Sequence, residues 1–350
     1  MRLDRVRCSA SPTLLRIITT AAMTFKTDKI STPSLYAAIE DDLASLSEAL
    51  QASLSTDNPF FSELNRHVLA NPGKRLRPAL LFLAGKMLSC VREPLVTYAV
   101  IYELIHTATL IHDDVIDEAE KRRGLASLNH VQGNTISVLY GDLLYTKANS
   151  LAVASKNLEV LDLICRVTQG MIEGEILQER WNFDLTISEQ DYFEILIAKT
   201  ALLFAATMET AGHVAGLNEE QRDALHQYGY NLGISFQLID DYLDYAGNEQ
   251  ALGKPVLSDL REGKVTLPVI RLLAREPKTE SLIRRCWSDH EDDAVLELRR
   301  AVIEHESLQE TWELGRRYAE QACSFLVHFP DNTFRQMLAQ VPELMLSRMT

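Results

Sequence analysis

Apolar residues recur along the chain at intervals of three or four positions, which is the pattern of amphipathic α-helices. Between residues 41 and 54 they fall at Leu43, Leu46, Leu50 and Leu54. The alternation of apolar and polar residues that is typical of strands is scarce. The pattern therefore predicts an almost entirely helical protein.

Two prolines, Pro78 and Pro94, stand where a first helical turn tolerates proline, so we expect helices to open there. The predicted long helices run over about 78–90, 94–117, 134–155, 158–180, 188–215 and 219–246, with shorter ones after Pro268. The segments 94–117 and 188–215 are apolar on most faces and should lie centrally. With no repeat of fixed period, the pattern predicts a single bundle of about a dozen helices.

We expect a poorly ordered leader over residues 1–30, followed by one helical domain over 31–350, because the first 22 residues differ in composition from the rest. Residues 1–22 carry four arginines and one acidic residue, Asp4. This composition also fits an amphipathic targeting peptide. It fits a signal peptide less well, because Arg16 interrupts the apolar part. We favour a disordered or misassigned leader, with Met23 as an alternative start.

The net charge, the cysteines and the apolar stretches of the chain limit the kinds of partner and compartment that we expect. A net charge of −14 argues against nucleic acid, because a protein that binds the phosphate backbone needs a basic face. The five cysteines are scattered without a CxxC pair, which favours reduced thiols in a cytoplasmic protein. The longest apolar stretches fall short of a membrane span, so no transmembrane segment is expected.

Two aspartate clusters of the same spacing, DDVID at 113–117 and DDYLD at 240–244, each follow a mostly apolar helical run. The first and last aspartates of each cluster lie one helical turn apart. Like charges at that spacing destabilise a helix by about 0.2–0.5 kcal/mol, and the helix dipole disfavours anions near its C-terminus. One such cluster could simply be a solvated helix end. Two of them favour bound Mg²⁺, which typically bridges carboxylates to a substrate phosphate.

Basic clusters flank both aspartate clusters. They are GKRLRP at 73–78, KRRG at 121–124, and DLREGK at 259–264 with Lys254 just before it. Lys74 and Arg77 fall at the start of a helix, where the dipole favours anions. Arginine forks match phosphate oxygens, and lysine acts as a point charge. Taken singly, each cluster is more often a solvated surface. Beside the carboxylates, they indicate two diphosphate pockets.

These motifs together resemble the trans-isoprenyl diphosphate synthase family, the polyprenyl synthetases, and in particular the long-chain branch that includes bacterial octaprenyl diphosphate synthases. The matching segments are GKRLRP at 73–78, IHTATLIHDDVIDEAEKRRG at 105–124, GDLLYTKA at 141–148, EGEILQ at 173–178, AKT at 198–200, and FQLIDDYLDY with LGKPVLSDLREGKVTLP at 236–268. The resemblance implies the all-α isoprenoid synthase fold with a central active-site cavity, a homodimer, and a prenyltransferase that joins isopentenyl diphosphate to an allylic diphosphate, farnesyl or shorter.

The resemblance also implies roles for single residues. Roughly two to three Mg²⁺ ions would be held by the two clusters, that is by Asp113, Asp114, Asp117, Asp240, Asp241 and Asp244. The allylic diphosphate would contact Arg122, Lys199, Thr200, Gln237, Lys254 and Lys264. Isopentenyl diphosphate would contact Lys74, Arg77, His106 and Arg123. His112 is assigned a structural role. Lys199 inside an apolar helix needs a partner or an anion in any case.

The chemistry implied is loss of diphosphate from the allylic substrate, attack by the double bond of isopentenyl diphosphate, and loss of a proton to the departed diphosphate. An apolar pocket must exclude water from the cation. Ala108 and Thr109, about one turn before Asp113, are small and would leave the product shaft open, for about seven to nine isoprene units. We therefore expect a product of about C35–C45, most simply octaprenyl diphosphate, for a quinone side chain.

Three rival functions remain open on the sequence. A class I terpene cyclase handles one diphosphate and would not need the pocket around Lys74 and Arg77. A head-to-head condensing enzyme would lack GKRLRP. A non-catalytic subunit of a heteromeric prenyl synthase would have lost motif aspartates, and none is missing here. Mg²⁺-dependent incorporation of isopentenyl diphosphate by the purified chain alone separates all three from a synthase.

Overall fold

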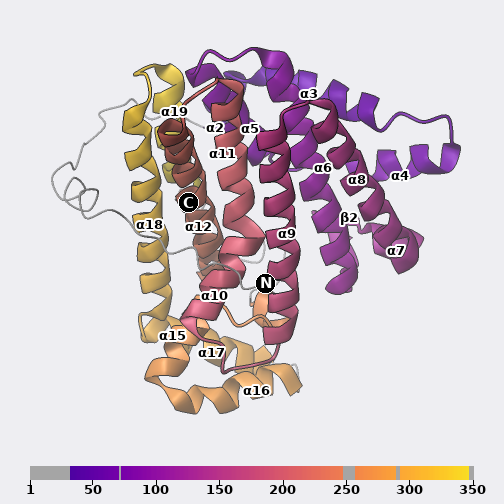
Figure 1. Cartoon of the computed structure of the whole chain (residues 1–350). Coiled ribbons are helices and arrows are strands. Elements are labelled where there is room, and N and C mark those ends of the chain that lie inside the picture. The colour runs from indigo at the N-terminus through magenta and orange to yellow at the C-terminus, as the bar shows by residue number, and fades with distance from the viewer. Residues whose placement is uncertain (1–31, 71, 247–256, 289–291, 347–350) are drawn as a thin grey trace, which may run out of the picture.

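Helices that run roughly side by side make up the part of the chain that the computed structural model describes, namely residues 32–70, 72–246, 257–288 and 292–346 (Figure 1). The expected leader over residues 1–30 lies outside these ranges, and so does Lys254. The predicted all-α fold is confirmed.

The helices follow one another along the two halves of the chain. The N-terminal half contains α2 (Thr32–Ala37), α3 (Glu40–Ser53), α4 (Pro59–Leu69), α5 (Leu76–Met87), α6 (Arg92–Ile116), α7 (Leu128–Gln132), α8 (Asn134–Ala154) and α9 (Leu158–Trp181). The C-terminal half contains α10 (Glu189–Leu196), the π-helix η1 (Ile197–Ala201), α11 (Leu202–Val214), α12 (Glu219–Ala246), α14 (Ser258–Arg261), α15 (Leu267–Arg275), α16 (Glu280–Ser288), α17 (Asp292–Glu304), α18 (Ser307–Phe325) and α19 (Thr333–Leu346), with 3₁₀ turns η2 (Pro277–Thr279) and η3 (Leu326–His328).

Three local features differ from the sequence-based predictions. The helix expected to open at Pro78 begins at Leu76, because Arg75 in a left-handed conformation (φ 46°) precedes it and Pro78 still falls within the first turn. The predicted helix over 188–215 contains the π turn η1, in which the Leu202 N–H donates to the Ile197 carbonyl. A two-stranded hairpin, β1 (Lys121–Arg122) and β2 (Leu125–Ala126), was not predicted.

The hairpin turn follows from two residues with positive φ, Arg123 (φ 51°) and Gly124 (φ 81°). Two consecutive residues of this kind make the tight turn that matches the twist of antiparallel strands. Arg122 pairs with Leu125, and Lys121 pairs with Ala126. The turn thus presents the KRRG arginines as a fixed unit beside the end of α6.

The apolar helices lie centrally, as expected. α12 packs against α11 and α18, while α6 packs against α8, and α11 against α5. Between α11 and α12 the backbones approach closely at Gly229 and Gly233. A Cβ on Gly229 would lie 2.4 Å from the Phe204 carbonyl oxygen, and one on Gly233 would lie 2.7 Å from the Ala201 Cα. Small residues on α12 therefore set the distance between these two helices.

Two helical runs, Arg92–Ile116 and Glu189–Val214, are long and apolar enough to cross a membrane by length and composition alone. The expectation that apolar stretches are too short for a span is therefore wrong for these two. Most of each apolar window is buried inside the bundle, 61% of the first and 72% of the second, which is the pattern of core helices.

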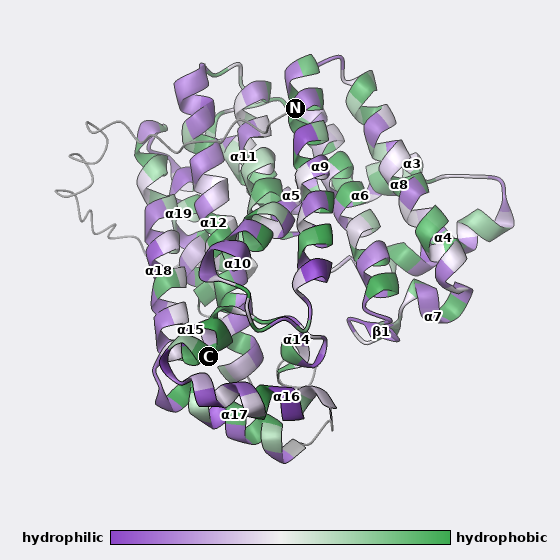
Figure 2. Ribbon diagram, turned by 60° about the horizontal axis from the view of Figure 1, so that its bottom comes forward, coloured by the Kyte–Doolittle hydropathy of each residue, from purple (hydrophilic) through white to green (hydrophobic). Residues whose placement is uncertain are grey.

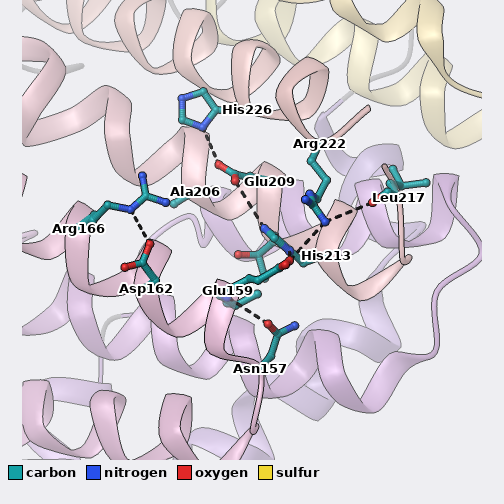
Figure 3. A network of polar contacts seen from close by, with 12 residues as sticks. Asn157, Glu159, Asp162, Arg166, Ala206, Glu209, His213, Leu217, Arg222 and His226 are labelled. Atoms are coloured by element: carbon teal, nitrogen blue, oxygen red, sulfur yellow. Dashed lines mark hydrogen bonds and ion pairs between the residues drawn. The ribbon is translucent and has the colours of Figure 1, made fainter. Parts of the chain in front are cut away.

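At the end of the bundle where α9 and α12 begin, a polar network joins α9, α11 and α12 (Figure 3). His213 lies between two carboxylates, 3.0 Å from Glu159 and 3.5 Å from Glu209. His226 contacts Glu209 at 2.8 Å, and Arg222 contacts Glu159 at 3.3 Å. These contacts fix the three helices at the end remote from the C-termini of α6 and α12.

Those two C-termini, which carry the aspartate clusters, lie at the other end of the bundle. Figure 2, with that end turned forward, shows the hairpin, α14 and α15 grouped there. Because α6 ends at Ile116 and α12 at Ala246, both clusters close their helices. The fold thus brings together two motifs that are far apart in the chain.

Gly229→Ala should lower the free energy of unfolding by about 1–3 kcal/mol, because the added methyl group meets backbone atoms of α11 that cannot move independently. Denaturant unfolding monitored by circular dichroism measures the change. Gly170→Ala is the matched control, since its Cβ would meet only the Leu202 side chain. We expect that control to be neutral or stabilising. Equal effects of the two substitutions would contradict the close α11–α12 contact.

Candidate active site

The aspartates of the first cluster, at the end of α6, differ in how far they are buried. Asp114 is buried and accepts a hydrogen bond from Arg122 Nε at 2.6 Å, which ties the cluster to the hairpin. Asp113 and Asp117 are partly exposed. Burial, followed by the nearby charge of Glu175, raises the pKa of Asp113 to about 6. Negative charge at Asp113 is therefore incompletely compensated by the protein.

The second cluster also contains both buried and exposed aspartates. Asp241 is buried and accepts hydrogen bonds from the Tyr192 hydroxyl and from Gln237 Nε2, at 2.5 and 2.9 Å. Asp244 is buried and accepts from the Ser258 hydroxyl at 2.8 Å, which secures the start of α14. Asp240 is the exposed member. Two of the three aspartates thus organise the protein around the site.

The AKT segment joins this second cluster through the π turn. Thr200 donates to Gln237 Oε1 at 3.0 Å, and Gln237 in turn donates to Asp241. Lys199 forms an ion pair with Glu175 of α9, with Nζ 2.6 Å from Oε2. The partner that the sequence required for Lys199 is therefore a carboxylate of the EGEILQ motif.

Lys264 joins the loop after α14 to the first aspartate cluster. It follows the second cluster in the chain, yet its Nζ lies 2.9 Å from Asp117 Oδ1 in the first and 2.8 Å from Glu262. Burial would lower the pKa of Lys264, but Asp117 and Glu262 outweigh burial and raise it well above its usual value. The lysine is charged at any physiological pH, and the loop after α14 is held against α6.

The predicted residues of the isopentenyl pocket come together from three elements. Arg77 of α5 lies 3.3 Å from His106 Nε2 of α6 and stacks over the Phe204 ring at 4.6 Å. The guanidinium of Arg123 packs on Gly73, where a Cβ would lie only 2.1 Å from it. Gly73 has φ +63° and precedes Lys74, so the GKRLRP loop and the hairpin fit together only with glycine there.

The electrostatics of this pocket depend on a residue that the sequence-based prediction missed. Glu103 of α6 is only 8% exposed, and its charge acts on Arg77 and Arg123. Burial lowers the pKa of Arg77 to about 10, and Glu103 opposes that effect. Burial and the neighbouring arginines lower the pKa of His106 well below its usual value, so His106 is neutral and accepts from Arg77. The sequence did contain a signal for Glu103, because it is a single glutamate inside an otherwise apolar helical segment.

A cavity of about 100 Å³ lies beside this pocket. Its polar wall includes Glu103, His106 and Arg123, and its apolar wall includes Leu104 and Leu128. It follows the face of α6 that points toward the hairpin. Ala108 and Thr109 do not line it.

The remaining predicted residues, His112, Ala108 and Thr109, make packing contacts and hydrogen bonds to backbone carbonyls. His112 contacts the Val138 carbonyl at 3.1 Å and packs on Gly141, where a Cβ would lie 2.3 Å from the ring, in keeping with its structural role. Ala108 is buried, and the Thr109 hydroxyl donates to the His106 carbonyl at 2.8 Å. Their role in product length stays a prediction.

The arrangement gathers oxygen donors at two helix ends and cations around them. Within the described ranges, no three histidine, cysteine or acidic side chains converge on one point as a ready-made metal site. Asp114, Asp117 and Glu175 instead pair with arginine or lysine, while Asp241 and Asp244 accept hydrogen bonds from uncharged side chains. Fold and site together define a class of protein, an all-helical bundle with acidic clusters and flanking cations at one end.

Comparison with known proteins narrows this class. Residues 58–304 match the Polyprenyl synthetase family. The chain is 35% identical to an octaprenyl diphosphate synthase of Haemophilus influenzae, over 92% of this chain and 99% of that protein. Among solved structures, it is similar to a polyprenyl synthase of Caulobacter crescentus complexed with calcium and isoprenyl diphosphate (TM-score 0.86, 35% identity, 93% and 100% of the two chains). It also resembles a decaprenyl diphosphate synthase of Rhodobacter capsulatus (TM-score 0.85, 33% identity, 90% and 98%).

The chain therefore belongs to the polyprenyl synthetase family. It is a prenyltransferase, and within the family it is a long-chain trans-polyprenyl diphosphate synthase.

Asp241→Asn should stabilise the metal-free protein increasingly as the pH rises. Burial, together with Asp259, raises the pKa of Asp241 to about 8, so the folded state holds this proton more tightly than the unfolded chain does. Stability is then lost as the pH rises from the unfolded value toward 8. Asparagine keeps an acceptor for Tyr192 without the charge. Thermal unfolding in chelator should show a larger gain in Tm at pH 8 than at pH 5, and a pH-independent difference would contradict the assignment.

Proposed function

We propose that this protein elongates farnesyl diphosphate, or a shorter allylic diphosphate, with successive isopentenyl diphosphates to octaprenyl diphosphate. The observation that carries the proposal is that one segment contacts both aspartate clusters. Ser258 of α14 donates to Asp244 in the second cluster, and Lys264 in the loop after α14 pairs with Asp117 in the first. The octaprenyl product is suggested by the name of the Haemophilus relative. A quinone side chain is the proposed use of a product of this length.

Mg²⁺ fits the carboxylates at this end of the bundle. The donors are all oxygen. Burial raises the pKa of Asp113, and so do the nearby charges of Glu175 and Asp117, which a divalent cation would compensate. Asp113, Asp117 and Asp240 would hold roughly two to three ions, and Asp114, Asp241 and Asp244 would orient the surrounding protein. When bound, the ions neutralise charge on the departing diphosphate.

The basic side chains divide between the two substrates. Arg122, Lys199, Thr200, Gln237, Lys254 and Lys264 would bind the allylic diphosphate. Lys74, Arg77, His106 and Arg123 would bind isopentenyl diphosphate. Lys199 and Lys264 would stabilise negative charge as the allylic diphosphate leaves, because they lie in a partly desolvated site. His106, being neutral, orients Arg77 and adds no charge. No protein base is assigned, and the leaving diphosphate takes the proton.

We further propose a cytoplasmic homodimer, with residues 31–350 as one helical domain after a leader. The exposed faces of α8 and α9 carry large apolar side chains, including Leu139 (59% exposed), Leu158 (76%) and Ile176 (65%). Exposed apolar patches of this kind indicate a protein–protein contact. A second copy of the chain would cover them. The scattered cysteines support a reducing compartment.

The purified chain should incorporate labelled isopentenyl diphosphate into a farnesyl-primed product only when Mg²⁺ is present. Asp113→Ala and Asp240→Ala should each lower this rate by about 100-fold or more while the helical circular dichroism is retained. Asp162→Ala is the control, because Asp162 forms an exposed pair with Arg166 on α9. A cyclised hydrocarbon, no incorporation, or full activity of both aspartate variants would each overturn the proposed function.

Ala108→Phe should shorten the main product toward about 15 to 20 carbons while the first condensation survives, because a filled shaft cannot accept another isoprene unit. Chromatography of the dephosphorylated products gives the chain lengths. Ala108→Ser is the control, since it keeps a small side chain at the same position. Full-length product from the phenylalanine variant would place the shaft elsewhere.

A further inference from the structure

The EGEILQ motif at 173–178 places one carboxylate in the site. Glu175 is partly buried, and its Oε2 lies 2.6 Å from Lys199 Nζ. The other polar members of the motif have partners within α9 or just after it. Glu173 is exposed and accepts from Gln169 at 2.8 Å, and Gln178 donates to Asn182 at 3.0 Å. Glu175 is therefore the polar member of the motif with a partner in the allylic site.

The backbone around Glu175 holds this contact tightly. A Cβ on the preceding residue, Gly174, would lie 2.6 Å from the Ala198 Cβ and 3.2 Å from the Lys199 backbone nitrogen. α9 and the π turn η1 therefore touch at this point, and no side chain fits between them. Because the two backbones are fixed, the distance from Glu175 to Lys199 depends only on their side chains.

The charge of Glu175 reaches the first aspartate cluster as well. Its carboxylate repels the carboxylate of Asp113, while the ammonium group of Lys199 attracts it. Glu175 and Lys199 thus form a neutral pair beside Asp113 as long as they stay together. If Lys199 is engaged by another anion, Asp113 and Glu175 face each other without that compensation.

We propose that Glu175 is a positioning residue that couples binding of the substrate diphosphate to binding of the divalent cation. In the ligand-free protein Glu175 occupies Lys199. A diphosphate oxygen, which carries more charge, displaces it from the lysine. Glu175 then adds its negative charge to that of Asp113 and Asp117, so the cation binds more tightly. The coupling is reciprocal, because the cation must favour the diphosphate by the same factor.

The inference rests on the proposed function, and it makes a prediction that a purely structural role does not. If Glu175 only held Lys199 in place, neutralising it would weaken diphosphate binding equally with and without metal. If Glu175 competes with the diphosphate, neutralising it leaves Lys199 available. Diphosphate binding without metal then becomes tighter, and the gain that the metal provides becomes smaller.

Calorimetric titration of inorganic pyrophosphate into the full chain, in chelator and in Mg²⁺, tests the proposal. In chelator, Glu175→Gln should bind about 2- to 5-fold more tightly than the wild type, the worth of a partly exposed ion pair. The gain from Mg²⁺ should fall by about 5-fold or more. Glu173→Gln, in the same motif but on the exposed face of α9, should match the wild type in both conditions. Weaker or unchanged binding in chelator, or an unchanged gain from Mg²⁺, overturns the proposal.

A second variant keeps the test independent of that substitution. Lys199→Gln leaves Glu175 without its cation. In the absence of any diphosphate, Mn²⁺ should therefore bind this variant several-fold more tightly than it binds the wild type. Electron paramagnetic resonance of free Mn²⁺ measures the binding. Unchanged or weaker Mn²⁺ binding contradicts the coupling. Failure of the wild type to bind pyrophosphate even with Mg²⁺ would instead count against the proposed function itself.

Discussion

Carboxylates crowded at the ends of two apolar helices must be compensated by positive charge, and most of the site follows from this requirement. Each of Asp114, Asp117 and Glu175 is matched by a cation, namely Arg122, Lys264 and Lys199. The first two pairs hold the hairpin and the loop after α14 against the end of α6, and the third holds the π turn against α9. The site proposed for phosphate and metal therefore already contains ion pairs, which its proposed ligands would have to exchange.

Close backbone contacts make this exchange possible without disturbing the fold. Gly174 lets α9 touch the π turn, Gly73 accepts the Arg123 guanidinium, and Gly229 sets the α11–α12 distance. Side chains can change partners while the backbones that carry them stay in place. At the opposite end, the network around His213 and Glu209 fixes the same helices, so movement of the long helices is restricted at both ends (Figure 3).

Much of this arrangement could be predicted because it depends on local spacing. The apolar period gave the long helices to within a few residues, and the DDVID and DDYLD clusters with their flanking basic residues indicated the site. The features that were missed depend on contacts across the fold. The role of Glu103 requires arginines from α5 and from the hairpin, and the partner of Lys199 lies on another helix. The π turn leaves no local signal, because its residues are as apolar as those of an ordinary helix.

That π turn has a consequence for how this region can change over time. It places one additional residue in the continuous helix from Glu189 to Val214, and Lys199 and Thr200 lie within it. Removing one residue there would convert the π turn to regular α-helix. The helix before it, α10, would then be rotated by about 100° about its axis relative to α11. Tyr192 would then face away from Asp241. A single-residue deletion would be more damaging in these five positions than most point substitutions, so their length should be harder to alter than their composition.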